Sequence, residues 1–232
     1  DKADGLPDAS DVPDWFRDGL VAAYGPARAD AMLAAQRHEA PTDFSVRGDP
    51  QKWAEALGGF VLPTGSVRVA RSGAIPALPG FAEGEWWVQD AAAALPARLL
   101  GAVAGLRVAD LCAAPGGKTA QLALAGAKVT AVDLSASRLA RLAQNMERLR
   151  LEVDLMQANL LEWQPDEPFD AVLLDAPCSS TGTVRRHPDV AWTKTTADID
   201  KLADLQRRLL ERAVELVKPG GRIVFSNCSL DP

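Results

Sequence analysis

Cysteine, histidine and long apolar runs are all scarce in this sequence. Its 232 residues include three cysteines and two histidines, and three unevenly spaced cysteines do not make a disulfide framework. No Cys-x-x-Cys pair is present, so a zinc site is not expected. No apolar run approaches the roughly 20 residues that span a bilayer. We therefore expect a reduced, cytoplasmic protein with neither a metal nor a membrane contact.

The charge balance is acidic. A net charge of −6 argues against a general nucleic-acid binder and leaves room only for a local basic patch. The hydrophobic fraction of 47% and the charged fraction of 24% are those of an ordinary globular protein. The length allows one large domain, or a main domain with a smaller attachment. Because the chain begins with Asp1 rather than Met, we expect a piece of a longer polypeptide.

Two regions differ in their hydrophobic pattern. Residues 1–85 are heterogeneous and punctuated by Pro and Gly, whereas residues 86–232 alternate apolar strands with helices of ten or more residues. The expected helices are 13–24, 26–40, 49–57, 89–103, 135–150 and 198–217, and a turn followed by a helix is expected over 114–126. The expected strands are 42–48, 65–73, 106–111, 127–133, 151–157, 169–175 and 220–227.

The second region predicts an α/β fold. Strands that alternate with helices form a parallel sheet with both faces covered, and its strands are apolar throughout because both faces are buried. Ligands bind such sheets outside the carboxyl ends of the strands. Cys178 and Cys228 each follow the end of an apolar strand, so both are candidates for a site at this edge.

The stretch "DLCAAPGGKT" (110–119) follows a strand and opens a helix. Gly116 and Gly117 allow a tight turn, and the helix amino end favours an anionic group, but the P-loop spacing is absent. A glycine-rich turn alone is often a simple strand-to-helix connection. Asp133, at the end of the next strand, is suited to hold ribose hydroxyls, which favours an adenosine cofactor and, without a phosphate signature, S-adenosylmethionine over NAD. Asn159 is either an adenine contact or a turn residue.

Longer motifs resemble those of the RNA 5-methylcytosine methyltransferase (Sun) family. They are "DLCAAPGGKT", "LLDAPCSSTGTVRRHPDVAW" and "SNCSLDP", supported by "PALPGFAEGEWWVQDAAA". The resemblance implies a Rossmann-like class I S-adenosylmethionine-dependent methyltransferase domain at 86–232, lacking its last strands, and a smaller α+β accessory domain at 1–85 that contacts RNA. It implies that the cofactor is held by Cys112, Ala113, Ala114, Pro115, Gly116, Gly117, Lys118, Asp133, Asn159 and Asp175.

The resemblance also implies two catalytic cysteines. Carbon 5 of cytosine becomes nucleophilic only when a thiolate adds to carbon 6, which divides one difficult step into easier ones. Cys228 matches the family's nucleophile, and Cys178 matches the second cysteine, which helps remove the carbon 5 hydrogen. Asp175 is expected to hydrogen-bond the base and stabilise the adduct. The ordinary alternative for each cysteine is a small buried residue at a strand end, and for Cys112 we expect only backbone contacts.

Basic residues follow the first of these cysteines. Arg185, Arg186 and His187 are expected to contact phosphates of RNA, although such a loop is often only solvated. Arg68 and Arg71 are further candidates. The target cytosine must be unstacked to enter a pocket. The expected partner is ribosomal RNA, most simply 16S rRNA, or an assembling small ribosomal subunit, and the protein is expected to be a monomer.

Two positions depart from the family pattern. Asn227 precedes Cys228 where the family usually has Thr, and Asn159 stands where it usually has an acid. Two alternatives stay open, the first because of the Pro177-Cys178 pair and the second because of these two departures. One is a DNA cytosine methyltransferase that uses Cys178 as nucleophile. The other is an S-adenosylmethionine-binding ribosome-assembly factor without catalytic activity.

Overall fold

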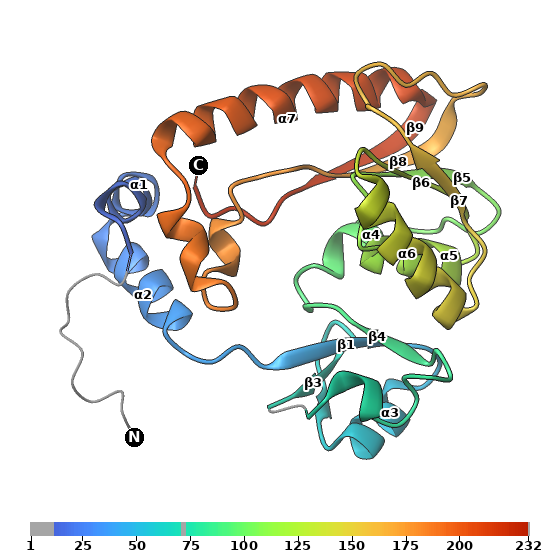
Figure 1. The fold of residues 1–232 in the computed structure, drawn as a ribbon, viewed down its shortest axis with the longest axis horizontal. Coiled ribbons are helices and arrows are strands. Elements are labelled where there is room, and N and C mark those ends of the chain that lie inside the picture. Colours follow the sequence, from blue (N-terminus) through green and yellow to red (C-terminus); the bar gives the residue numbers. More distant parts are fainter. Residues whose placement is uncertain (1–11, 71–72, 232) are drawn as a thin grey trace. The chain divides into compact units, whose positions relative to one another are not determined.

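The computed structural model describes residues 12–70 and 73–231. These residues form two compact units, each assembled from separate stretches of the chain (Figure 1). The larger unit consists of residues 41–177 and 206–226, and the smaller one of residues up to 40, 178–205 and 227 onward. No helix in the described part of the chain has the length and apolar character needed to cross a membrane.

A parallel five-stranded sheet is the centre of the larger unit. Its strands are β5 (Arg107–Leu111), β6 (Lys128–Asp133), β7 (Asp154–Gln157), β8 (Phe169–Asp175) and β9 (Val217–Ser226). Their order is β7-β6-β5-β8-β9, and every neighbouring pair is parallel. The predicted Rossmann-like sheet is therefore confirmed. The strand order reverses between β5 and β8, which is where ligands bind in such sheets.

Three helices cover one face of this sheet. They are α4 (Leu95–Leu99), α5 (Gly117–Leu124) and α6 (Ala136–Leu149), and they bury apolar side chains such as Ala97, Leu122 and Leu142. The part of α7 (Thr196–Leu216) that belongs to this unit lies on the opposite side of the sheet (Figure 1). The central strands β5 and β8 are buried, but the edge strand β7 is exposed along its length. The expectation of strands buried on both faces therefore holds only at the centre.

The predicted helix over residues 89–103 is wrong. Turns occupy residues 91–94, and the helix itself is the short α4. Pro96 explains the late start, because proline is tolerated in the first turn of a helix but not in its interior. The Gln89 side chain, which precedes the turns, is hydrogen-bonded to Trp87, Ser45 and Gln121.

A four-stranded antiparallel sheet completes the larger unit. It contains β1 (Thr42–Val46), β2 (Phe60–Val61), β3 (Val67–Val69) and β4 (Trp86–Val88) in the order β2-β3-β1-β4, with α3 (Pro50–Leu57) and the 3-10 turn η1 (Ile75–Ala77) beside it. Its core includes Phe44, Trp53 and Trp86. Because β4 pairs with β1, this sheet extends past residue 85, the expected domain boundary. The division of the chain into an accessory and a catalytic domain stays a prediction.

The smaller unit is mainly helical. It contains α1 (Asp14–Tyr24), α2 (Pro26–Gln36), the 3-10 helices η2 (Thr181–Thr183) and η3 (Pro188–Trp192), and the first part of α7. Phe16 and Leu20 of α1 pack with Val184 and Ala191 from the loop after β8. The α2 helix ends four residues before the expected end at residue 40.

Candidate functional site

The loop after β5 bends tightly toward α6. Cys112 takes the left-handed conformation with φ of 60°, and the next backbone amide, that of Ala113, donates to the carbonyl oxygen of Val132 over 3.1 Å. Gly116 caps α5 with φ of 99°, and a Cβ atom there would lie 2.8 Å from Leu142 Cγ. Only glycine fits both the backbone conformation and this close approach.

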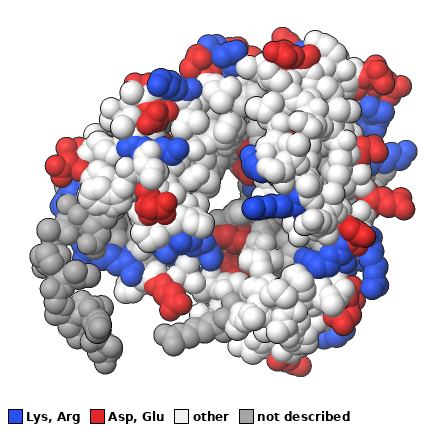
Figure 2. All heavy atoms as spheres, viewed as in Figure 1, with Lys and Arg blue, Asp and Glu red and all other residues white. Residues whose placement is uncertain are grey.

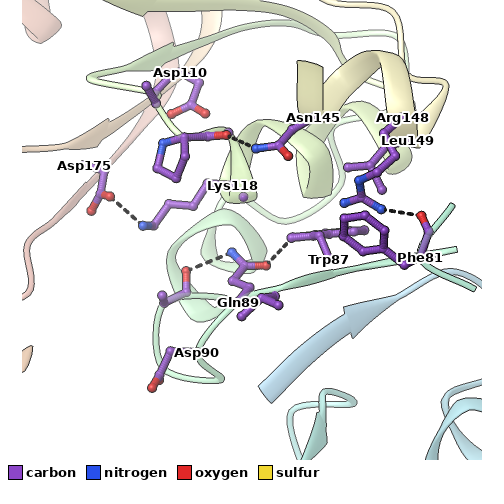
Figure 3. Close-up of a pocket in the computed structure, with 17 residues that line it drawn as sticks. Phe81, Trp87, Gln89, Asp90, Asp110, Lys118, Asn145, Arg148, Leu149 and Asp175 are labelled. Carbon is purple, nitrogen blue, oxygen red and sulfur yellow. Dashed lines mark hydrogen bonds and ion pairs between the residues drawn. The ribbon is translucent and has the colours of Figure 1, made fainter. Parts of the chain in front are cut away.

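A pocket of about 330 Å³ lies against this loop in the larger unit (Figure 3). It is open at the carboxyl ends of β5 and β8, the position expected for a ligand in this fold. Asp110, Gln89, Asn145 and Arg148 are among its lining side chains. Seven of the predicted cofactor residues also line it, namely Ala113, Ala114, Pro115, Gly116, Gly117, Lys118 and Asp175.

Asp110 and Asp175 are the two acidic side chains of the pocket at the ends of β5 and β8. Asp175 Oδ2 accepts from Lys118 Nζ over 2.6 Å, and Asp175 Oδ1 accepts from Ser226 Oγ over 2.8 Å. Asp110 Oδ2 accepts from Thr119 Oγ1 over 2.6 Å, while Asp110 Oδ1 is buried without a hydrogen-bond partner in the described chain. Burial raises the pKa of Asp110 to about 7, against the opposing effect of the Thr119 hydroxyl. An unpartnered buried acceptor is suited to a donor or cation brought by a ligand.

Three predicted cofactor residues lie outside this lining. Asp133 is 3% exposed, and its two oxygens accept from the backbone amides of Ala114 (3.2 Å) and Ser135 (3.0 Å). These bonds hold the loop after β5; Asp133 Oδ2 also forms an ion pair with Arg138 Nη1 over 3.5 Å, whereas Oδ1 keeps a further lone pair. Asn159 Oδ1 accepts from the Leu161 amide over 3.2 Å, which is the contact of a turn residue. Cys112 is partly buried, and desolvation raises the pKa of its thiol to about 12, which disfavours the thiolate form.

The smaller unit brings the other two cysteines together. Cys178 Sγ and Cys228 Sγ lie 3.3 Å apart without a disulfide, and the Cys228 amide donates to Cys178 Sγ over 3.4 Å. The hydrogen bond from Cys228 is the main reason that the pKa of Cys178 is lowered to about 5, and Ser229 adds to this effect. Cys228 is exposed, whereas Cys178 is partly buried. The lowered pKa favours the thiolate form at Cys178, beside the solvent-accessible sulfur of Cys228.

The predicted RNA contacts lie on the loop between η2 and η3. Arg186 and His187 are exposed and Arg185 is partly exposed. Acidic and basic side chains are interspersed over the visible surface in Figure 2, so any RNA contact on that face has to be local. Arg68 instead donates to both oxygens of the buried Asp43, at 2.7 and 2.8 Å, and has a structural role. Arg71 lies outside the described residues.

Sequence reasoning missed several polar and aromatic residues. Asp110 was seen only as the first letter of its motif, although an acid at the end of a buried strand was a usable signal. Gln89 is 6% exposed, and its Oε1 accepts from Trp87 Nε1 over 2.9 Å and from Ser45 Oγ over 2.7 Å. Trp192 is 62% exposed on η3.

Among residues 12–70 and 73–231, no group of three His, Cys, Asp or Glu side chains forms a metal cluster.

Comparison with known proteins identifies the family. Residues 97–232 match the model of the 16S rRNA methyltransferase RsmB/F family, and the chain belongs to this family. It is 44% identical over 183 residues to ribosomal RNA small subunit methyltransferase B of Klebsiella pneumoniae (strain 342), covering 76% of this chain and 42% of that protein. It is 40% identical over 238 residues to the protein of that name from Pseudomonas syringae pv. tomato, covering 95% and 52%. The chain thus spans about half the length of these relatives.

A solved structure agrees with this family. A methyltransferase homolog protein from Pyrococcus horikoshii superimposes with a TM-score of 0.80 and 31% identity, over 93% of this chain and 73% of that one. The α/β methyltransferase architecture is therefore common to the two proteins.

Proposed function

We propose that this chain carries the catalytic part of an S-adenosylmethionine-dependent methyltransferase that forms 5-methylcytosine in small-subunit ribosomal RNA in the cytoplasm. Membership of the 16S rRNA methyltransferase family supports the reaction class and the RNA substrate. The observation that supports the cytosine-5 reaction most directly is the pair of thiols, with their sulfur atoms 3.3 Å apart. A covalent cytosine mechanism needs one sulfur to attack and a second group to remove a proton.

The pocket in the larger unit fits S-adenosylmethionine. This cofactor carries a sulfonium and an ammonium group, and the pocket offers the Asp110 and Asp175 carboxylates together with the backbone of the loop from Ala113 to Gly117. Asp110 Oδ1, buried and unpartnered in the described chain, is our candidate for the ammonium group. When bound, the cofactor supplies an electrophilic methyl group. Lys118 holds Asp175 in position through its 2.6 Å ion pair.

The two cysteines divide the work on the base. Cys228 is the exposed member of the pair, and as thiolate it adds to carbon 6 of cytosine, so that the ring electrons move to carbon 5. After carbon 5 has taken the methyl group, Cys178 accepts the carbon 5 proton or orders a water that does so. Elimination then breaks the bond from Cys228 Sγ to carbon 6 and releases the thiolate. Asp175 ends β8 and precedes Cys178 by three residues in the sequence.

A second mechanism has Cys178 as the nucleophile, as in DNA cytosine methyltransferases. The lowered pKa of Cys178 favours it, whereas the partial burial of Cys178 and the exposure of Cys228 favour the first. Because the thiols are coupled, their ionisation belongs to the pair and does not identify the attacking sulfur. Only a chemical test separates the two mechanisms.

The test is methyl transfer from labelled S-adenosylmethionine to unmethylated small-subunit rRNA by full-length wild type, Cys228→Ser and Cys178→Ser. We expect 5-methylcytosine with wild type and none with Cys228→Ser. Retention of activity by Cys228→Ser with loss in Cys178→Ser would assign the attack to Cys178. Cofactor binding without transfer to any RNA or DNA tested would leave the role of an assembly factor.

A further inference from the structure

A cluster of polar side chains ties two separate stretches of the smaller unit together. Asp231 Oδ1 accepts from Ser179 Oγ over 2.6 Å and also from Thr181 Oγ1. Ser229 Oγ lies 2.7 Å from Ser179 Oγ. Ser179 is 1% exposed and Thr181 is 0% exposed, so a single carboxylate oxygen satisfies two buried hydroxyl groups. We call Asp231, Ser179, Thr181 and Ser229 the Asp231 cluster.

Backbone contacts extend the connection to Cys228. The Leu230 amide donates to Thr181 Oγ1 over 2.9 Å, and the Gly182 amide donates to the Cys228 carbonyl oxygen over 2.9 Å. A Cβ atom on Gly182 would lie 2.6 Å from that oxygen, so the two stretches touch closely. Cys228 therefore lies between the end of β9 and a set of contacts to the loop that begins at Cys178.

Residues 227–231 belong to no helix or strand, and neither do residues 176–180. The β8–β9 ladder ends where Asp175 pairs with Ser226 and the Ala176 amide donates to the Ser226 carbonyl oxygen over 2.9 Å, so other contacts join the two stretches beyond that point. Beyond the ladder, residues 227–231 are joined to residues 178–182 by the Asp231 cluster, by the two backbone amides named above, and by the contacts of Cys228 with Cys178 and Ser180. The 3.3 Å distance between Cys178 Sγ and Cys228 Sγ depends on how residues 227–231 lie against this loop, because both cysteines come after the end of the ladder.

We propose that Asp231 is a positioning residue that holds Cys228 against Cys178 by accepting hydrogen bonds from Ser179 and Thr181. The inference rests on the proposed function in taking these two thiols as the reacting groups. Hydrogen bonds to a carboxylate are stronger than those between neutral groups, and a buried hydroxyl that loses its acceptor bears a desolvation penalty. Loss of the carboxylate should therefore release residues 227–231 and separate the sulfur atoms.

Two substitutions distinguish this role from simple packing. Asp231→Ala removes the acceptor for both hydroxyls. Asp231→Asn keeps an oxygen at the same place, and a single oxygen is enough because both bonds go to Oδ1. Asp231→Asn should therefore keep Cys228 close to Cys178, whereas Asp231→Ala should not. Asp18→Ala is the matched control, since Asp18 is an exposed acid of α1 in the same unit.

The primary measurement is the rate of alkylation of Cys178 and Cys228 by iodoacetamide as a function of pH, read peptide by peptide by mass spectrometry. It uses the full-length protein without RNA or cofactor. In wild type, the alkylation rate of Cys178 should rise with pH with an apparent pKa near 5, the value to which its hydrogen bonds lower it. Asp231→Ala should move this pKa upward by about one unit or more, toward the ordinary thiol value of roughly 8.5. In Asp231→Asn the alkylation pKa should stay close to the wild-type value, and in Asp18→Ala it should equal that value.

Methyl transfer is measured on the same variants. Asp231→Ala should lower kcat at least tenfold with little change in the KM for RNA. An unchanged alkylation profile in Asp231→Ala would overturn the proposal, even if the melting temperature falls, and so would equal effects of Ala and Asn. If Asp231→Ala does not fold, Thr181→Val, which keeps the side-chain shape and removes one hydroxyl, has to raise the alkylation pKa. Because alkylation needs no substrate, its result stands even if wild type transfers no methyl group.

Discussion

Asp110 makes the stability of this protein depend on pH in an unusual direction. The side chain is fully buried in the pocket wall, and burial raises its pKa from 3.8 to about 7, with the Thr119 hydroxyl and Lys118 opposing the shift. The folded protein therefore binds this proton more tightly than the unfolded chain does. A shift of about three pKa units corresponds to about 4 kcal/mol of folding free energy. This contribution is complete below about pH 4 and is lost as the pH rises through about 7.

The test is urea unfolding of wild type and Asp110→Asn at several pH values between 4 and 8. Relative to Asp110→Asn, the unfolding free energy of wild type should fall by up to about 4 kcal/mol across this range. Asp170→Asn is a control of opposite sign, because hydrogen bonds from Lys218 and the Arg107 amide lower the pKa of Asp170. Stabilisation by Asp170 is present above its unfolded pKa and is lost as the pH falls. Parallel profiles for wild type and Asp110→Asn would refute the assignment of a protonated, desolvated carboxyl group.

Three further substitutions test the site. Trp192→Ala, which removes an aromatic ring that is 62% exposed, should weaken RNA binding by about 1–3 kcal/mol if the ring stacks on a base; unchanged affinity in filter binding would exclude that contact. Gly182→Ala should slow methyl transfer without changing cofactor affinity, because its Cβ would lie 2.6 Å from the Cys228 carbonyl oxygen; a wild-type rate would show that this close approach does not position the thiol. Gly116→Ala should lower cofactor affinity in calorimetric titrations, since φ is 99° and the new Cβ would meet an α6 leucine at 2.8 Å. Gly19→Ala, with no neighbour within 4 Å, is its control, and equal affinities of these two variants would contradict the argument.

Much of the fold was predictable from hydrophobic pattern and helix-end signals. Pro13 and Gly25 bound α1 as expected, and Gly58 ends α3 in a left-handed cap. The strands of the parallel sheet are near-continuous apolar runs, so their existence and order of appearance were clear. The helix predicted at 89–103 was wrong. A run of alanines has high helix propensity, but the Gln89 side chain makes hydrogen bonds to residues outside this segment, which local propensity does not include.

The site was predictable as a set of motifs and not as a geometry. The residues of the loop from Ala113 to Lys118 line one pocket because they are consecutive. The approach of Cys178 and Cys228 depends on contacts between stretches about 50 residues apart, including those of Asp231. A single sequence cannot show that Asp231 accepts from Ser179. Asn159 illustrates the opposite case, because its side chain makes the local turn contact that was the simpler alternative.

The central claim is that Cys228 forms the covalent bond to cytosine and Cys178 is needed for its release. The most direct measurement is peptide mapping of the protein–RNA adduct formed by Cys178→Ser with S-adenosylmethionine and unmethylated small-subunit rRNA. We predict a stable adduct in this variant, with a methylated cytidine attached to the peptide that contains Cys228. An adduct that forms in Cys228→Ser, attached to Cys178, would contradict the account.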